Sequence, residues 1–181
     1  MTSQVPYASD IGLIVALKLA NLSRANGGKT ELCAVFAADP VSVGSIADAE
    51  AEQLLGLARQ SADVVELLAG HVEGAIDAAA ELVNQLLERF PAQLHLTKRE
   101  AGWMLHRHQP DAALVPAWSA VVAGAFARVI GDGQDSRVGS CAATDCATYF
   151  YDLSKNQSRR YCSLACQNRI KAAAYRSRQP G

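Results

Sequence analysis

The chain of 181 residues has little charge and few aromatic side chains, with 19% charged and 6% aromatic residues, while half of its residues are apolar. This balance excludes wholesale disorder and allows a sizeable core. Residues 1–10 contain no Lys or Arg, so we expect no secretory signal. The most apolar early run, residues 11–22, is too short and too polar to span a bilayer. We therefore expect a cytoplasmic protein without membrane contact.

The sequence also lacks the motifs of common enzyme classes: a G-x-S-x-G nucleophile, a glycine-rich phosphate loop or an H-E-x-x-H metal motif. His106 and His108 stand two apart on a predicted strand and would face one side, as half of a metal site. His71 and His95 have no evident cysteine or carboxylate partner. Since metal sites usually need three or four ligands, we favour surface or hydrogen-bonded histidines and expect no enzyme. A metal-dependent enzyme in the N-terminal part is the alternative.

Charge is distributed unevenly along the chain. Residues 1–136 carry 9 Lys+Arg and 16 Asp+Glu, a net charge of −7, whereas residues 137–181 carry 8 Lys+Arg and 2 Asp, a net charge of +6. Such a split indicates a basic contact module attached to an acidic body. The Gly- and Asp-rich run before residue 137 predicts the boundary, so we assign a body over residues 1–131, a linker over 132–136 and a C-terminal module over 137–181.

Apolar periodicity predicts a mainly helical body. Helices are expected over residues 8–24, 49–69, 72–90 and 110–130, strands over 31–37, 93–97 and 103–108, a hairpin loop over 98–102, and extended chain over 41–46. In the first helix, helix-like intervals separate Ile11, Ile14, Val15, Lys18 and Leu22. Trp103, Trp118, Phe36 and Phe90 could line a small-molecule pocket or belong to the core, and the sequence leaves both open. The fold class is α+β, mostly helical with a short β hairpin or small sheet.

Four cysteines follow the pattern C-x4-C-x15-C-x3-C: Cys141, Cys146, Cys162 and Cys166. Two close pairs separated by a longer excursion are typical of a tetrahedral zinc site, because each short loop chelates at low entropic cost. Without a histidine or spare carboxylate, such a site is closed, so we predict one structural Zn²⁺ per chain. Two disulfides, or four unrelated thiols, are the alternatives. The fifth cysteine, Cys33, is expected to be a small buried hydrophobe in the strand over 31–37.

The order of elements around these cysteines predicts a treble-clef-like finger. A loop over residues 142–145 joins the first pair, strands over 149–152 and 159–161 form a hairpin, and a helix runs from Cys162 to about Arg176. Cys162 and Cys166 would then lie one turn apart on the same side of the helix.

Several segments together resemble the CGNR-type zinc finger: Cys141-x4-Cys146, residues 150–156, residues 158–163 and Cys166-Gln167-Asn168-Arg169-x-Lys171. Proteins of that family carry an N-terminal ABATE domain before the finger and are described as stress-induced transcription regulators of bacteria. The resemblance implies a finger that contacts DNA and an N-terminal domain that senses a small ligand or forms a homodimer. Gln167 stands where the motif has Gly, and Tyr161 where Trp is expected; a close backbone approach at residue 167 is therefore in doubt.

The predicted helix separates its side chains into faces. Cys166, Ile170 and Ala173 should face the metal, with Asn168, Lys171 and Tyr175 outward and Arg169 and Arg176 on one flank. The candidate nucleic-acid contacts are Arg159, Arg160, Asn168, Arg169, Lys171, Tyr175, Arg176 and Arg178. Tyr149 and Tyr151 could stack on unpaired bases. In the alternatives the arginines neutralise thiolates and brace the finger, and the module binds a protein instead of nucleic acid.

Overall fold

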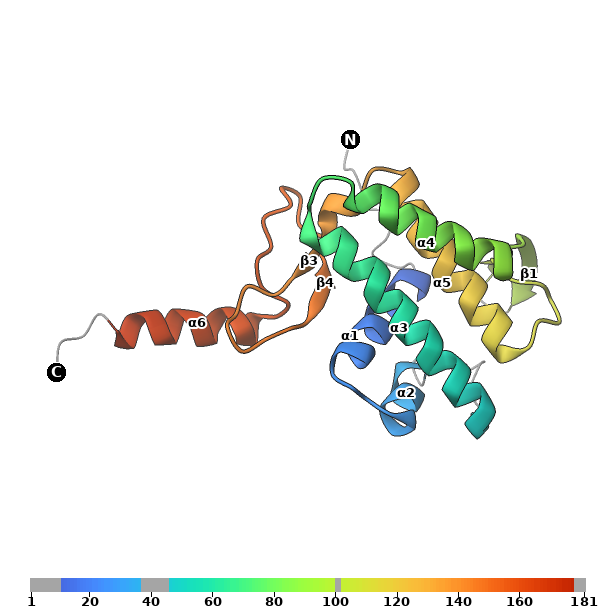
Figure 1. The fold of residues 1–181 in the computed structure, drawn as a ribbon, viewed down its shortest axis with the longest axis horizontal. Coiled ribbons are helices and arrows are strands. Elements are labelled where there is room, and N and C mark those ends of the chain that lie inside the picture. The colour runs from blue at the N-terminus through green and yellow to red at the C-terminus, as the bar shows by residue number, and fades with distance from the viewer. Residues whose placement is uncertain (1–10, 37–45, 100–101, 178–181) are drawn as a thin grey trace.

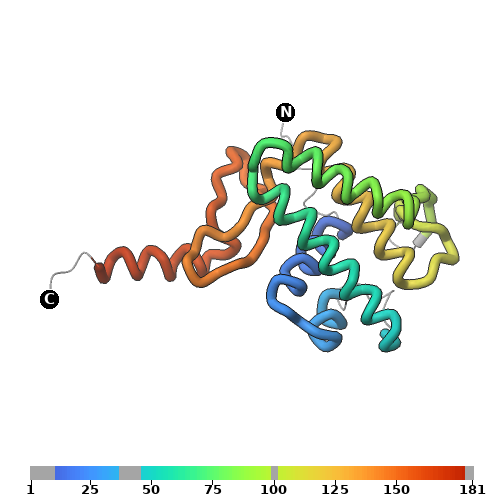
Figure 2. The backbone as a smooth tube through the Cα atoms, viewed as in Figure 1, coloured from blue at the N-terminus to red at the C-terminus, as the bar shows by residue number. Residues whose placement is uncertain are grey.

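The computed structural model describes residues 11–36, 46–99 and 102–177. A helical body forms one part of an elongated molecule, and the C-terminal module projects from one end of it (Figures 1 and 2). The body contains α1 (Ile11–Arg24), α2 (Lys29–Phe36), α3 (Asp48–Gly70), α4 (Ala75–Arg89), β1 (His95–Arg99), β2 (Gly102–His106) and α5 (Leu114–Gly131). The C-terminal module contains the short 3-10 helix η1 (Asp135–Arg137), β3 (Val138–Ser140), β4 (Tyr149–Tyr151) and α6 (Leu164–Arg176).

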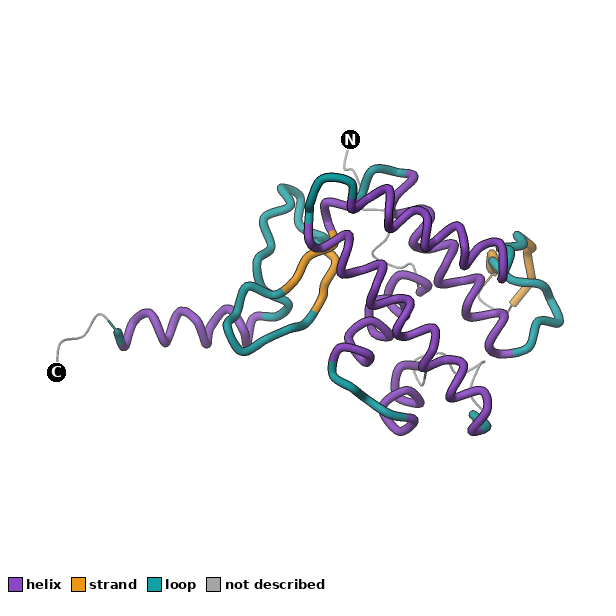
Figure 3. The backbone as a smooth tube through the Cα atoms, viewed as in Figure 1, coloured by secondary structure: helices purple, strands orange, loops and turns teal. Residues whose placement is uncertain are grey.

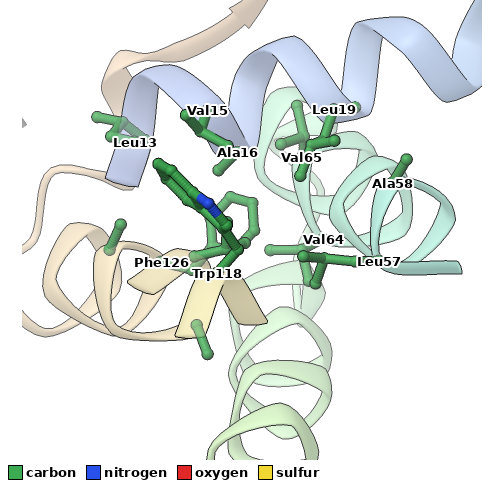
Figure 4. Close-up of a cluster of buried hydrophobic side chains, with 14 of the residues drawn as sticks. Leu13, Val15, Ala16, Leu19, Leu57, Ala58, Val64, Val65, Trp118 and Phe126 are labelled. Carbon is green, nitrogen blue, oxygen red and sulfur yellow. The ribbon is translucent and has the colours of Figure 1, made fainter. Parts of the chain in front are cut away.

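The core of the body lies where α1 and α4 each pack against both α3 and α5. Trp118 and Phe126 of α5 are buried among apolar side chains of α1 and α3 (Figure 4). The ring of Trp118 lies 5.0 Å from that of Phe36 in α2, between centroids. Within the described residues, α5 is the helix long and apolar enough to cross a bilayer, and half of it is buried here. Its apolarity is accounted for by this central position, since core helices satisfy the same test.

The predicted fold class is confirmed: the N-terminal region is mostly helical, and the chain has two small two-stranded sheets and a C-terminal four-cysteine cluster with a hairpin. The hairpin predicted over 93–108 is present, with β1 antiparallel to β2. The predictions for residues 8–10, 41–45 and 100–101 lie outside the described residues. The helix predicted over residues 72–90 begins at Ala75 rather than at residue 72, because His71 and Gly74 adopt positive φ angles of 48° and 78° that interrupt the helix.

The strand predicted over residues 31–37 is wrong, because residues 29–36 form helix α2. Leu32, Val35 and Phe36 are buried at the i, i+3, i+4 spacing of one helical face, and this packing overrides the strand preference of Val and Phe. The Glu31 carboxylate accepts a hydrogen bond from the Gly28 N–H at 3.0 Å and so satisfies a free donor at the helix start. Cys33 therefore lies on a helix, half-buried against the core.

Helix α1 buries only part of the predicted stripe, since Val15 and Leu22 are buried. Ile11 and Ile14 remain 42% and 39% exposed, and Lys18 is also exposed. The buried face also includes Gly12, where α1 lies close to α5: a Cβ atom at this glycine would lie 2.9 Å from the Val121 carbonyl oxygen. The buried face of α1 thus combines a small residue at the contact with α5 and the large side chains of Leu13 and Leu19.

This close approach predicts opposite effects of alanine at two helical glycines. Gly12→Ala should lower the free energy of unfolding by about 1–3 kcal/mol, since backbone must move to admit the methyl group. At Gly56, in the interior of α3, a Cβ would come no nearer than 3.8 Å to Arg59 Nη2. Gly56→Ala should therefore raise stability by about 0.5–1 kcal/mol through helix propensity. Denaturant unfolding of both variants checks this; an unchanged Gly12→Ala protein would contradict the described α1–α5 contact.

Candidate metal centre

The C-terminal module is built on the hairpin of β3 and β4. Val138 pairs with Tyr151 and Ser140 with Tyr149, and the Cys141 N–H continues the ladder by donating to the Thr148 carbonyl at 3.0 Å. The strand predicted over residues 159–161 is wrong, because β4 takes β3 as its partner. Residues 159–161 instead form a loop whose Arg160 carbonyl accepts a hydrogen bond from Ala142 N–H at 2.9 Å.

One face of this hairpin is packed on the body. Val138, Tyr149 and Tyr151 belong to the same buried cluster as the body helices. The side-chain amide of Asn21 in α1 accepts a hydrogen bond from the Tyr149 N–H at 2.7 Å and donates one to the Tyr149 carbonyl at 3.0 Å. The Arg24 guanidinium lies 4.4 Å from the centre of the Tyr149 ring. The hairpin is therefore packed into the core of the body and is not an independent unit.

The predicted stacking of Tyr149 and Tyr151 on unpaired bases is wrong. The two side chains are 5% and 7% exposed and face the body. Burial raises the pKa of Tyr149, partly opposed by the charge of Arg24. Alternation along a strand has a simple consequence here: Tyr149 and Tyr151 share the inward face, and Phe150 points to the other side.

Asp152 organises the long loop between β4 and α6, which Figure 3 draws in teal. Its buried carboxylate accepts hydrogen bonds from the Ser154 N–H at 2.7 Å and the Arg159 N–H at 2.8 Å. Arg137 donates from Nη1 to the carbonyls of Asp152 and Ser154 at 2.9 and 3.0 Å. Burial by itself would raise the pKa of Asp152, but these hydrogen bonds and the Arg137 charge lower it overall. Both residues escaped our list of site residues, although an Asp two positions before a Ser is a recognisable turn signal.

The four predicted ligands come together. The Sγ atoms of Cys141, Cys146, Cys162 and Cys166 all lie within 4.8 Å of one another. Cys162 Sγ is 3.6 Å from Cys146 Sγ and 3.5 Å from Cys166 Sγ. These separations exclude a disulfide from Cys162 to Cys146 or to Cys166, since a disulfide joins its sulfur atoms at about 2.05 Å. Sulfur ligands about 2.3 Å from a tetrahedral Zn²⁺ stand about 3.8 Å apart. The donor set and its spacing thus fit one zinc ion.

The surroundings of the cluster favour ionisation of the Cys146 thiol and oppose ionisation of the Cys162 thiol. Hydrogen bonds from the Thr148 hydroxyl, 3.3 Å from Cys146 Sγ, and from its N–H lower the pKa of the Cys146 thiol to about 6. Burial, then hydrogen bonding with Cys166, Cys146 and Cys141, raises the pKa of the Cys162 thiol to about 12. Without a cation, one thiolate in the group opposes the next. A bound divalent ion removes this conflict, because the thiols release their protons to solvent and bind the ion as thiolates.

Helix α6 begins one residue after Ser163 rather than at Cys162 as predicted. The Ser163 hydroxyl caps the helix by accepting a hydrogen bond from the Cys166 N–H at 3.3 Å. This cap places Cys162 just before the helix and Cys166 in its first turn, so both sulfur atoms point at the cluster. Arg169, one turn later, lies with Nη2 3.7 Å from Cys166 Sγ.

The candidate nucleic-acid contacts fall into two groups. Arg159 is a brace: it donates to the carbonyls of Tyr161, at 2.8 Å, and Cys162, and lies 4.9 Å from the centre of the Phe150 ring. Arg169 is directed to a ligand sulfur. The remaining described candidates are exposed: Arg160, Asn168, Lys171, Tyr175 and Arg176. Arg178 lies outside the described residues. Ala173, predicted to face the metal, is exposed, because α6 has already left the finger at that point.

The comparisons agree with this geometry. Residues 137–179 match the CGNR zinc finger family, so the four-cysteine cluster lies within a CGNR zinc finger and marks a metal site. The match does not extend to residues 1–136, for which the resemblance to an ABATE domain stays a prediction. No curated protein matches the chain.

The cluster makes a direct prediction about metal content. Cys162→Ser should lose the zinc ion of the finger, since serine is a poor substitute for a thiolate and structural zinc contributes about 10–16 kcal/mol to the folding of small fingers. Cys33→Ser is the matched control, because Cys33 lies on α2 and belongs to a different cluster. Zinc per chain should be counted by native mass spectrometry during competition with a chelator. Equal retention by the two variants would contradict the assignment of Cys162 as a ligand.

Proposed function

We propose that this protein is a transcription regulator whose C-terminal zinc finger contacts duplex DNA through α6. The observation that carries the proposal is the exposure of this helix: among its 13 residues, only Cys166 is buried. The helix projects from the finger, away from the body (Figure 1). A helix left uncovered by its own chain is suited to a partner, and a diameter of about 10–12 Å matches the major groove of B-DNA.

Charge supports nucleic acid as that partner. The helix sequence LACQNRIKAAAYR contains three cations and no Asp or Glu. Lys171 and Arg176 are exposed and available for phosphates, while Asn168 is exposed on the same helix and could read a base edge. Because the N-terminal 136 residues are net acidic, the excess of positive charge lies in residues 137–181.

A cleft at the base of α6 offers a second point of contact. It has a volume of about 430 Å³ and lies between the loop after β4 and the first turn of α6. Its lining includes Arg160, Ser158, Ser163 and Gln167. Donors of this kind suit a phosphate group. Gln167 thus occupies the motif's Gly position and contributes a side chain to this cleft, so its contacts here need not copy those of the family.

The metal and the body have supporting roles in this proposal. The ion is Zn²⁺, held by four thiolates in a closed structural site that fixes α6 to the hairpin. The body acts as ligand sensor or dimeriser, because a single finger of this size binds weakly and a homodimer would raise its affinity. A cleft of about 610 Å³ next to α3 is lined by Phe90 and could hold a small ligand. Trp118 and Phe36 are core residues instead, and Trp103 is exposed.

A protein-binding scaffold is the alternative, and one observation favours it. Leu164 is 75% exposed at the start of α6, and Leu153 is 45% exposed across the same cleft. Exposed leucines in a cleft suit an apolar partner side chain better than a phosphate. The two functions differ in which residues they require, so charge reversal separates them.

The test compares two charge-reversed variants in binding to duplex DNA over a salt series. Lys171→Glu with Arg176→Glu should weaken binding and reduce the salt dependence of log Kd by about 2, one for each lost phosphate contact. Lys18→Glu with Lys98→Glu makes the same change of net charge on exposed positions of the body. This control should bind nearly as the unmodified chain does.

Equal loss in both variants would indicate a nonspecific effect of net charge rather than a contact by α6. Undetectable binding of the zinc-loaded chain at low salt would overturn the DNA proposal. A scaffold role would then be tested with Leu164→Ser, which should weaken the binding of a protein partner.

A further inference from the structure

Three histidines meet at the hairpin β1–β2, at the end of the body opposite α6 (Figure 1). The sequence places His106 and His108 on one side of a strand, where surface or hydrogen-bonded histidines were favoured and half of a metal site was the alternative. The strand register adds a third ring, because His95 pairs directly with His106 across the hairpin. All three side chains are half-buried. The hairpin thus brings together a cluster that spacing along the chain could not reveal.

The rings are arranged at the separations of a three-imidazole metal site. Their centroids lie 4.8 Å (His95–His106), 5.2 Å (His106–His108) and 5.6 Å (His95–His108) apart. A metal–nitrogen bond of about 2.0–2.1 Å places each ring centre about 3.2 Å from the ion, and tetrahedral ligands then stand about 5.2 Å apart between centres.

Hydrogen bonding determines which nitrogen of His108 is available. Its Nδ1 lies 2.6 Å from the Gln109 carbonyl, which can only accept, so Nδ1 carries the proton and Nε2 carries the lone pair. This Nε2 lies 3.3 Å from His106 Nδ1, the edge length expected for two nitrogen ligands on one ion. A backbone carbonyl that holds the far nitrogen of a ligand histidine is a common feature of metal sites. The Thr97 hydroxyl, 2.7 Å from His106 Nε2, is placed to do the same for His106.

His95 supplies a further observation that points to a bound ion. Its Nδ1 is inaccessible to solvent and has no hydrogen-bond partner among the described residues. A buried polar nitrogen without a partner costs free energy, and an ion or a water molecule at that position is the usual explanation.

We propose that His95, His106 and His108 form a second metal site, which binds one divalent first-row transition metal ion through neutral imidazoles. Three nitrogen ligands suit Zn²⁺ and its neighbours in the series and leave the fourth position open to solvent. Within the described residues the four cysteines are the group whose ligand atoms already converge. The His95 ring lies stacked on the His106 ring with 12° between their planes, and two rings stacked in this way cannot both bind one ion. Binding therefore requires the His95 ring to turn towards the other two, which its lack of a hydrogen bond at Nδ1 permits.

The test counts zinc ions on the full chain by native mass spectrometry during a Zn²⁺ titration. The unmodified protein should bind two ions, one in the finger and one at the histidines. His106→Ala with His108→Ala should bind one. His71→Asn should still bind two, because His71 is exposed at the end of α3 and asparagine tolerates its positive φ angle. Binding of a single ion by the unmodified chain, or of two by the double variant, would overturn the proposal.

A second measurement needs no variant and covers the case in which the double substitution disturbs the hairpin. Adding a second equivalent of Zn²⁺ to the one-zinc protein should shift the NMR ring signals of His95, His106 and His108 and leave those of His71 in place. Ring signals that do not respond to zinc at neutral pH would identify the cluster as a hydrogen-bonded histidine chain only.

Discussion

The four cysteine sulfur atoms hold α6 to the rest of the molecule. Cys166 is the helix's one buried side chain, and the cluster around it is small: Cys141, Ala143 and Cys166 are buried, with Cys146, Tyr161, Cys162 and Ile170 partly so. A core of this size cannot stabilise a fold without a further constraint. Metal–sulfur bonds provide that constraint, so the position of the proposed DNA-contacting helix depends on the ion.

The hairpin β3–β4 depends on a different set of contacts. Its inward residues complete the core of the body, and Asn21 pairs with both backbone groups of Tyr149. The body thus fixes the strands that carry Cys141 and lead from Cys146, while the metal joins these cysteines to the pair at α6. A change in the body near α1 would therefore move the finger and its helix together. This is a physical route by which a ligand or a second copy bound to the body could influence the proposed DNA contact.

Features encoded locally could be predicted from the sequence. The cysteine spacing identified the metal ligands because each pair lies within one short loop, and apolar periodicity located four of the five body helices. Helix α2 was missed because its eight residues are too few for periodicity to distinguish helix from strand. Contacts between distant segments left no local signal. Asn21 and Tyr149 are 128 positions apart, so the burial of Tyr149 and the docking of the finger emerged only from the fold.

The same limit applied to the histidines. His106 and His108 were paired by their spacing, but His95 joins them through the register of a hairpin whose turn could not be placed to the residue. Arg159 illustrates the converse. Its charge and position made it a candidate DNA contact, while its donors are directed to the carbonyls of Tyr161 and Cys162. Charge alone does not distinguish an arginine that contacts DNA from one that stabilises a loop.

We infer that the metal ion holds α6 while the body holds the hairpin β3–β4. Hydrogen exchange of the full chain, with zinc bound and after chelation, tests this inference most directly. If the ion holds α6 and the body holds the hairpin, chelation should remove the protection of amides over residues 164–176 and of the Ala142 N–H. The Tyr149 N–H, bonded to Asn21, should stay protected at the level of the body helices. Retained protection of α6 without metal would contradict the account. Loss of protection at the Tyr149 amide together with α6 would also contradict it.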